Sequence, residues 1–122
     1  MTEKDLHKQI CNHIKEQYPK LIFNTDASGI RLTIGQATQM KKLRSSNGFP
    51  DIVIYEGNTQ SNALFLEVKK ETPYKKDGSL KSNEHLQEQN LMHTKLKEKG
   101  FQSCFVWSLD MAIKTIKNYL NT

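Results

Sequence analysis

The chain has 122 residues, of which 36% are hydrophobic and 25% charged, so it predicts one domain over residues 1–122 and is not typical of a disordered protein. No apolar stretch approaches the roughly 20 residues that span a bilayer, and the N-terminal residues lack the basic start and apolar core of a secretion signal. The formal net charge of +5 favours a polyanionic partner.

The first third of the chain predicts an amphipathic helix, a short strand and a polar segment. In the helix, Leu6, Ile10 and Ile14 recur every four residues and form one apolar face. Pro19 ends the helix because it cannot continue the backbone hydrogen bonds. The polar segment, residues 24–47, is assigned no role and is a candidate for substrate choice or a dimer contact. The elements are expected at residues 3–18 (helix), 21–23 (strand) and 36–43 (helix), with turns at Gly29 and Gly35.

The rest of the chain predicts two strands joined as a hairpin, then a helix, a strand and a last helix. A polar turn joins the first two strands. Gly100 is a helix C-terminal signal, and Ser108 can cap the last helix. The strand, helix, strand order predicts a crossover, and therefore an α/β fold with a central mixed sheet flanked by helices. The elements are expected at residues 51–56, 63–69 and 101–107 (strands) and at 82–99 and 109–120 (helices).

Two acids and a lysine stand at the ends of the paired strands. Asp51 starts one strand directly after Pro50, and Glu67 and Lys69 end the next. Because residues i and i+2 of a strand point to the same face, Glu67 and Lys69 project together. If the strands pair, Asp51 lies beside them. The alternative is an ordinary surface ion pair, which we favour less because the apolar residues 64–66 lead into Glu67.

This grouping suits a divalent cation. Mg²⁺ prefers oxygen ligands and usually retains several waters. Asp51 and Glu67 can supply two carboxylates, and the backbone carbonyl of Val68 a third oxygen. A metal there would neutralise a scissile phosphate and lower the pKa of a bound water, and Lys69 could orient or activate that water. The pattern therefore predicts a metal-dependent nuclease.

The motifs resemble a known group of nucleases. Gly48-Phe49-Pro50-Asp51 and Leu66-Glu67-Val68-Lys69-Lys70-Glu71 are similar to the motifs of the PD-(D/E)XK nuclease superfamily. More narrowly, they resemble the small stand-alone form of the virus-type replication-repair nuclease (VRR-NUC) family. Glu88-Gln89, followed by Leu96 and Gly100, fits that family's pattern of a glutamine on the helix after the catalytic strand. The resemblance covers most of the chain after residue 48 and is weaker before it.

The resemblance implies a restriction-endonuclease-like core, dependence on Mg²⁺ or Mn²⁺, and cleavage of DNA phosphodiester bonds. Stand-alone members are associated with branched DNA, including Holliday junctions, and act as dimers. In this superfamily a further acid often comes from the first helix. Glu3 matches that place best and Glu16 is the rival, although an acid in a first turn is also ordinary helix-dipole chemistry.

Gln89 can also be judged from the residues around it. It lies in the middle of a helix face that Leu86, Met92 and Leu96 make apolar. An amide there must find a partner or leave a polar group buried and unpaired. We expect Gln89 to reach the metal site and hold a water or Lys69; the alternative is a glutamine at the helix edge, bonded to backbone.

Two basic clusters flank the motif and are candidates for contacts with nucleic acid. Phosphate contacts supply affinity that falls with salt and does not read sequence. Tyr74 could stack on an exposed base. For any single lysine, a solvated loop is the alternative. The candidates are Lys41, Lys42 and Arg44 before the motif, and Lys70, Lys75, Lys76 and Lys81 after it.

The sequence therefore predicts an endodeoxyribonuclease that is structure-selective on branched DNA. Because a four-way junction needs two symmetric cuts, we expect a homodimer. A flap or restriction-type nuclease on the same fold, and a non-catalytic nucleic-acid-binding module, are the alternatives. Whether one or two metals act stays open. Cys11 and Cys104 form neither a metal spacing nor a disulfide framework, so we expect a reducing, cytoplasmic location.

Overall fold

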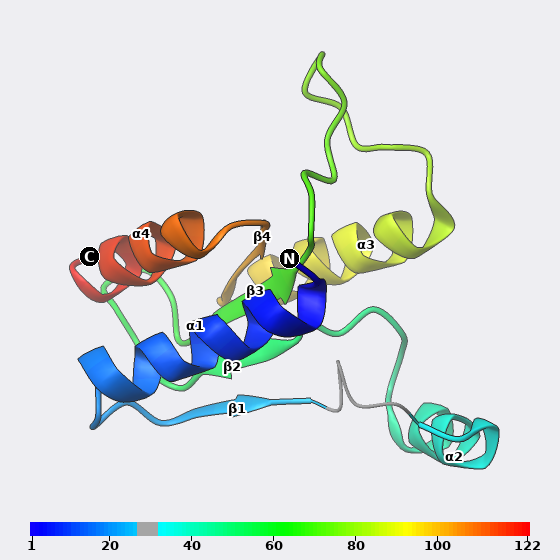
Figure 1. Ribbon diagram of the computed structural model, residues 1–122, viewed down its shortest axis with the longest axis horizontal. Coiled ribbons are helices and arrows are strands. Elements are labelled where there is room, and N and C mark those ends of the chain that lie inside the picture. Colours follow the sequence, from blue (N-terminus) through cyan, green and yellow to red (C-terminus); the bar gives the residue numbers. More distant parts are fainter. Residues whose placement is uncertain (27–31) are drawn as a thin grey trace.

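A mixed sheet organises the chain in the computed structural model, which describes residues 1–26 and 32–122 (Figure 1). Within those residues, four strands lie across the sheet in chain order. β1 pairs with β2 and β2 with β3 in antiparallel fashion, whereas β3 and β4 are parallel. This confirms the α/β fold with a mixed sheet. The strands are β1 (Phe23–Thr25), β2 (Ile52–Ile54), β3 (Leu64–Val68) and β4 (Gln102–Val106).

Helices cover both faces of the sheet. α1 and α4 pack on one face, where Leu66, Val68 and Val106 of the strands meet Ile10 of α1 and Ile116 of α4 in the apolar core. Because side chains alternate along a strand, the residues between them on β3 and β4 face α3. The helices are α1 (Glu3–Gln17), α2 (Ile34–Leu43), α3 (Glu84–Glu98) and α4 (Leu109–Leu120).

The helix ends follow local hydrogen bonds. Thr2 and Asp5 form a capping box at the start of α1, and its buried face is the one that the sequence predicts. α3 begins at Glu84, two residues later than expected, because the Asn83 side chain accepts the Leu86 N–H. It ends at Glu98, one residue before the expected Lys99, and Gly100 follows as the predicted stop signal, with φ of +92° and its N–H donating to the Lys97 carbonyl. Ser108 caps α4 as expected.

The segment before β2 differs most from the sequence prediction. β1 starts at Phe23 and not at residue 21, because the Leu21 N–H donates to the Tyr18 carbonyl in a turn after α1. α2 starts at Ile34, where Thr33 caps it, so Gly35 is helical and not a turn. The expected turn at Gly29 lies outside the described residues.

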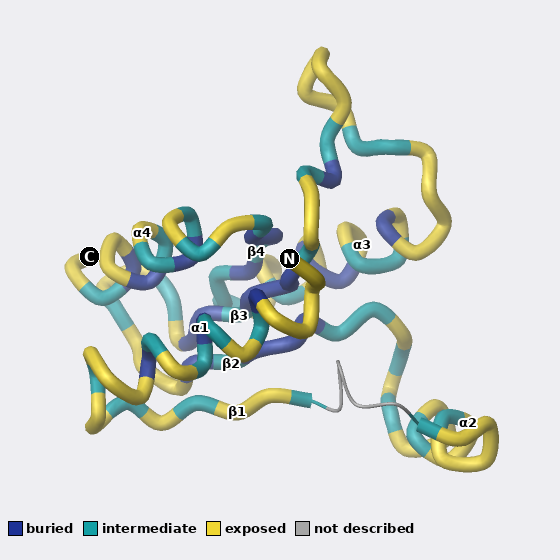
Figure 2. The backbone as a smooth tube through the Cα atoms, viewed as in Figure 1, coloured by how far each residue is buried: buried dark blue, intermediate teal, exposed yellow. Residues whose placement is uncertain are grey.

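α2 stands apart from the sheet in Figure 1. None of its residues is buried (Figure 2). Ile34, at its start, is 89% exposed. Arg44, just after the helix, pairs with Asp26 at 3.5 Å. The helix therefore receives no support from the apolar core.

Among the described residues, no helix is long and apolar enough to cross a membrane. Cys11 and Cys104 are free thiols, each half-buried.

His93 is a buried polar residue between α3 and β4. It is 3% exposed, its Nδ1 hydrogen-bonds the buried Ser103 hydroxyl, and its ring lies edge-on to Phe105 at 4.5 Å. Nε2 is buried with no hydrogen-bond partner among the described residues. Burial, helped by the charge of Lys97, lowers the pKa of His93 from 6.5 to about 4. His93 is therefore a neutral core residue.

Acid should destabilise the protein through His93. Below about pH 6.5 the unfolded histidine binds a proton that folded His93 does not bind until about pH 4. The free energy of unfolding should therefore fall across this window, by up to about 3 kcal/mol. Urea denaturation from neutral pH to pH 4 measures it. His93→Gln, which cannot titrate, should lose less stability over the same window; an equal loss would assign the effect to other groups.

Candidate active site

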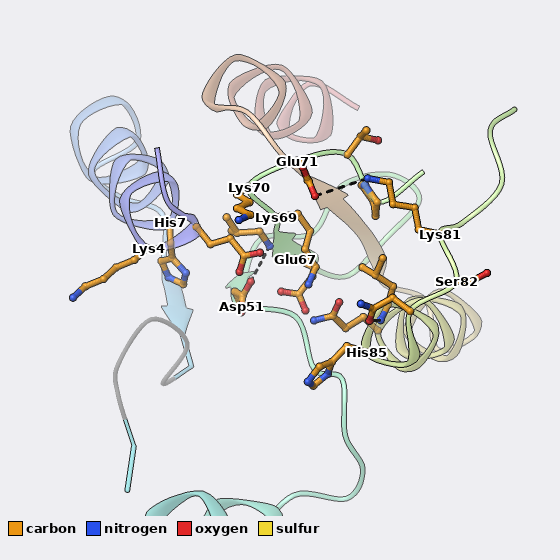
Figure 3. A pocket seen from close by; sticks show the side chains of 17 residues that line it. Lys4, His7, Asp51, Glu67, Lys69, Lys70, Glu71, Lys81, Ser82 and His85 are labelled. Carbon is orange, nitrogen blue, oxygen red and sulfur yellow. Dashed lines mark hydrogen bonds and ion pairs between the residues drawn. The ribbon is translucent and has the colours of Figure 1, made fainter. Parts of the chain in front are cut away.

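One cleft collects most of the residues that the sequence singles out. It has a volume of about 720 Å³ and lies between the end of β3, the start of β2 and the first turns of α1 and α3 (Figure 3). The residues predicted for the site that line it are Glu3, Asp51, Glu67, Val68, Lys69, Lys70 and Gln89. The cleft is thus the place where segments far apart in the sequence meet.

Asp51 and Glu67 face each other across two strands. The antiparallel register pairs Ile52 with Leu66, so the preceding Asp51 stands opposite Glu67. Asp51 is 8% exposed and Glu67 3%. The Asp51 Oδ2 atom accepts the Val68 N–H at 2.8 Å, which fixes the aspartate to β3. The register and this bond together hold two buried carboxyl groups at one place.

The electrostatics of the pair are strained without a cation. Burial, the hydrogen bond with Asp51 and the negative charge of Asp51 raise the pKa of Glu67 from 4.5 to about 11. Lys69 acts in the opposite direction and lowers it, but less strongly. Two carboxyl groups this close cannot both be ionised cheaply unless a positive charge lies between them. The pair therefore favours either a bound proton or a cation.

Lys69 follows the end of β3 and belongs to the same cluster. Its backbone N–H donates to the Val106 carbonyl at 2.9 Å, which extends the parallel pairing with β4 by one residue. The side chain is half-buried, and in Figure 3 it lies with Asp51 and Glu67. The predicted grouping of two acids and one lysine is present in the structure.

Gln89 places an amide oxygen in the cleft wall. Its Oε1 atom is buried and has no hydrogen-bond partner among the described residues, although the residue itself lines the cleft. A buried acceptor without a donor is costly, by about 1–3 kcal/mol. The site is therefore suited to a donor that comes with a ligand, such as a water or an ammonium group.

Gly48 fixes the approach to Asp51. Its φ is +84°, and a Cβ at this position would lie 2.8 Å from the Glu88 carbonyl oxygen of α3. The backbone before Pro50 thus packs directly on the α3 backbone, next to Gln89. This contact connects the loop that carries Asp51 to the helix that carries Gln89.

The donor set fits a hard divalent cation. Among the described residues, no group of three or more His, Cys, Asp or Glu side chains forms a metal cluster. Mg²⁺, however, is commonly bound by only one or two carboxylates and keeps several waters. Asp51 and Glu67 supply two, and such a cation would relieve the repulsion between them, which Lys69 offsets only in part.

The two rival acids of α1 lie at opposite ends of the helix. Glu3, in the first turn, lines the cleft. Glu16 is thirteen residues further on, which is roughly 20 Å along a helix, and does not line it. Of the two, only Glu3 is placed to join the site.

Sequence reasoning assigned no role to two histidines that line the cleft, His7 and His85. His7 lies one helical turn after Glu3, and that i, i+4 spacing was the available signal. The His7 Nε2 atom hydrogen-bonds the Thr25 hydroxyl at 2.8 Å, and this hydroxyl donates to the Asp26 carbonyl. His7 therefore donates from Nε2, since the one hydroxyl proton is already used.

The basic candidates divide into three places. Lys70 and Lys81 line the cleft, Lys41 and Lys42 are exposed on α2, and Lys75 and Lys76 lie outside the cleft in the segment before α3. Arg44 already pairs with Asp26. Of these candidates, the structure therefore brings Lys70 and Lys81 to the cleft that holds the acids.

Tyr74, which the sequence suggested could stack on a base, is half-buried and contacts two other aromatic rings. Its ring packs edge-on against Phe105 and Trp107, with centroids 6.1 and 5.9 Å away. The polar loop gave no sign of this contact, because a single aromatic residue has no periodicity to indicate what it packs on.

Comparison with known proteins supports the fold. No protein-family model and no curated protein matches the chain. A solved structure described as a VRR_NUC domain protein is similar, with a TM-score of 0.71 and 17% sequence identity. The similarity covers 99% of this chain and 89% of that chain. At this identity the likeness establishes a shared fold.

Replacing Glu67 with glutamine should stabilise the protein when no divalent cation is present. Because the pKa of folded Glu67 is raised, the folded protein keeps a proton on Glu67 that the unfolded chain loses above about pH 4.5. The free energy of unfolding therefore falls as the pH rises above that value. Glutamine has no such requirement. Glu67→Gln should therefore raise the free energy of unfolding at neutral pH by about 1–3 kcal/mol, measured by urea denaturation in a chelator.

The exposed Glu16→Gln is the matched control and should change stability little. Equal stability of Glu67→Gln and the wild type at neutral pH would show that Glu67 is accommodated as a carboxylate without a cation.

Proposed function

We propose that this protein is a Mg²⁺- or Mn²⁺-dependent endonuclease that hydrolyses DNA phosphodiester bonds and acts on branched DNA such as Holliday junctions. The proposal rests chiefly on one observation: Asp51 and Glu67 are buried opposite each other, beside Lys69, at the wall of an open cleft. A protein keeps two facing acids buried at a cost to stability when a site uses them.

In this proposal, Asp51, Glu67 and the Val68 carbonyl would hold the metal ion, and Glu3 of α1 lines the same cleft as a further acid. When bound, the ion supplies charge neutralisation at the phosphate and lowers the pKa of a coordinated water. Lys69 donates hydrogen bonds that orient the water and stabilise the negative charge that develops on phosphorus-bound oxygens. The water oxygen forms the new bond to phosphorus as the bond to the leaving oxygen breaks; the water gives up one proton to solvent, and the leaving oxygen takes one up from solvent.

Gln89 completes the arrangement. Its unpaired Oε1 accepts a hydrogen bond from the water or from the Lys69 ammonium group and so fixes the direction of attack. Gln89 lies on α3 beside the Gly48 contact, where the helix packs on the loop that leads to Asp51.

Membership of the VRR-NUC family, within the PD-(D/E)XK superfamily, is part of the proposal. It is supported by the shared fold with a VRR_NUC domain protein and by the positions of Pro50-Asp51, Glu67-Val68-Lys69 and Gln89 around one cleft. The exposed lysines on α2 and before α3 would bind DNA phosphates outside the cleft.

Cleavage should require both Asp51 and Lys69. Asp51→Asn keeps an acceptor for the Val68 N–H but removes a metal-binding charge, and Lys69→Met keeps the apolar stem but removes the ammonium group. Each should lower the cleavage rate by about 100-fold or more on labelled four-way, flapped and linear duplex DNA with Mg²⁺ or Mn²⁺.

Lys114→Ala, which removes an exposed lysine on α4, is the control and should cut like the wild type. Undiminished cutting by Asp51→Asn or Lys69→Met would reject the assignment. Mn²⁺ binding can be followed separately, because Asp51→Asn should abolish the rise in melting temperature that Mn²⁺ gives the wild type.

The proposal includes a homodimer, because a four-way junction needs two cuts related by symmetry. Light scattering at working concentration should give about twice the 14.1 kDa of one chain. A single 14.1 kDa species, with and without junction DNA, would contradict this part of the proposal.

A further inference from the structure

Residues 72–81 form a hairpin that projects from the body of the protein (Figure 1). Thr72, Pro73 and Lys81, at its two ends, line the cleft. Tyr74 bridges to Leu80, and backbone hydrogen bonds join Lys75 to Ser79 at 2.7 Å and Lys81 to Pro73 at 2.9 Å. At the tip, the Gly78 N–H donates to the Lys75 carbonyl, with φ of +89° at the glycine. We call residues 72–81 the basic hairpin. Its own hydrogen bonds define its shape.

The base of the basic hairpin is fixed to the body of the protein. Pro73 is fully buried, and the Tyr74 ring packs on Phe105 and Trp107 at the end of β4. The tip is the opposite: every residue from 75 to 79 is exposed (Figure 2). The tip therefore adds nothing to the apolar core, and its ordered projection needs another explanation.

The tip carries positive charge that no carboxylate in the described residues pairs with. Among the described residues, ion pairs join Arg44 to Asp26 and Lys81 to Glu71. Neither Lys75 nor Lys76 takes part in an ion pair there. Asp77 is turned back into the hairpin, where its Oδ1 accepts the Ser79 N–H and hydroxyl at 2.9 and 2.6 Å. The two lysines are thus exposed at the tip of a hydrogen-bonded hairpin.

The cleft itself offers little for an unpaired base to stack on. Among the described residues that line it, Phe, Tyr and Trp are absent, and the aromatic rings are the imidazoles of His85 and of His7, which is hydrogen-bonded to Thr25. Tyr74 does not line the cleft, and its ring lies against Phe105 and Trp107. Proteins that hold single strands generally stack bases on aromatic rings. Ammonium groups without aromatic partners instead suit a phosphate backbone.

From these observations we infer that the site takes the phosphate backbone of duplex DNA, and that the basic hairpin is an arm whose Lys75 and Lys76 contact the duplex flanking the cut. This inference rests on the proposed nuclease function and specifies its substrate as paired DNA that extends beyond the cleft. The arm lies outside the chemistry, so it contributes to affinity and not to bond breaking.

The test is DNA binding by the Asp51→Asn protein, which separates affinity from cleavage. Fluorescence anisotropy gives the Kd for a four-way junction, a linear duplex and a single strand of equal length over a range of salt. The parent should bind the paired DNAs more tightly than the single strand. Adding Lys75→Ala and Lys76→Ala should reduce the slope of log K against log salt by about 0.9 for each phosphate that the arm no longer neutralises, that is, by between one and two for duplex DNA.

Lys114→Ala with Lys117→Ala, both on α4, removes the same charge elsewhere and should leave the slope unchanged. Because all four lysines are exposed, the melting temperatures should also stay unchanged. An equal slope in the hairpin variant and its parent, or tighter binding of the single strand than of duplex, overturns the inference. If the slope is reduced in the hairpin variant but the wild-type protein cuts no DNA, the inference about the arm stands and the proposed nuclease function is rejected.

Discussion

The hydrogen bond from the Val68 N–H to the Asp51 carboxylate is the constraint on which the site depends. It extends the pairing of β2 and β3 beyond the last paired residues, Ile52 and Leu66. The acceptor is a side-chain carboxylate and not a backbone carbonyl. The register alone would place Asp51 opposite Glu67, but this bond fixes the direction of the aspartate as well. A slip of one residue would turn Glu67 toward the apolar core and separate the two acids.

β3 serves two purposes because its side chains alternate. Leu64, Leu66 and Val68 point into the core under α1 and α4 and are almost completely buried. Glu67, between them, points to the α3 side, where the cleft lies. Burial of the apolar face stabilises the fold and offsets the cost of burying the two carboxyl groups on the other face. A strand with a weaker apolar face would hold the carboxyl groups less well.

The sequence predicted those parts of the fold and site that depend on neighbouring residues. The core strands, the α1 face and the Gly100 helix end all have local signals, and two acids at the ends of paired strands must come together. The start of β1, the separation of α2 from the core and the packing of Tyr74 depend on distant contacts that leave no pattern in a polar stretch. His7 was missed for a similar reason, because a histidine on a helix does not indicate which cleft the helix will border.

The contact of Gly48 with the α3 backbone has a consequence for the width of the cleft. No side chain separates the two segments, so any larger residue at position 48 would have to push loop and helix apart. Asp51 is held to β3 by the Val68 N–H, whereas Gln89 belongs to α3. A wider separation at residue 48 would therefore move the amide away from the aspartate, and the missing side chain is what keeps the two within reach of one ligand.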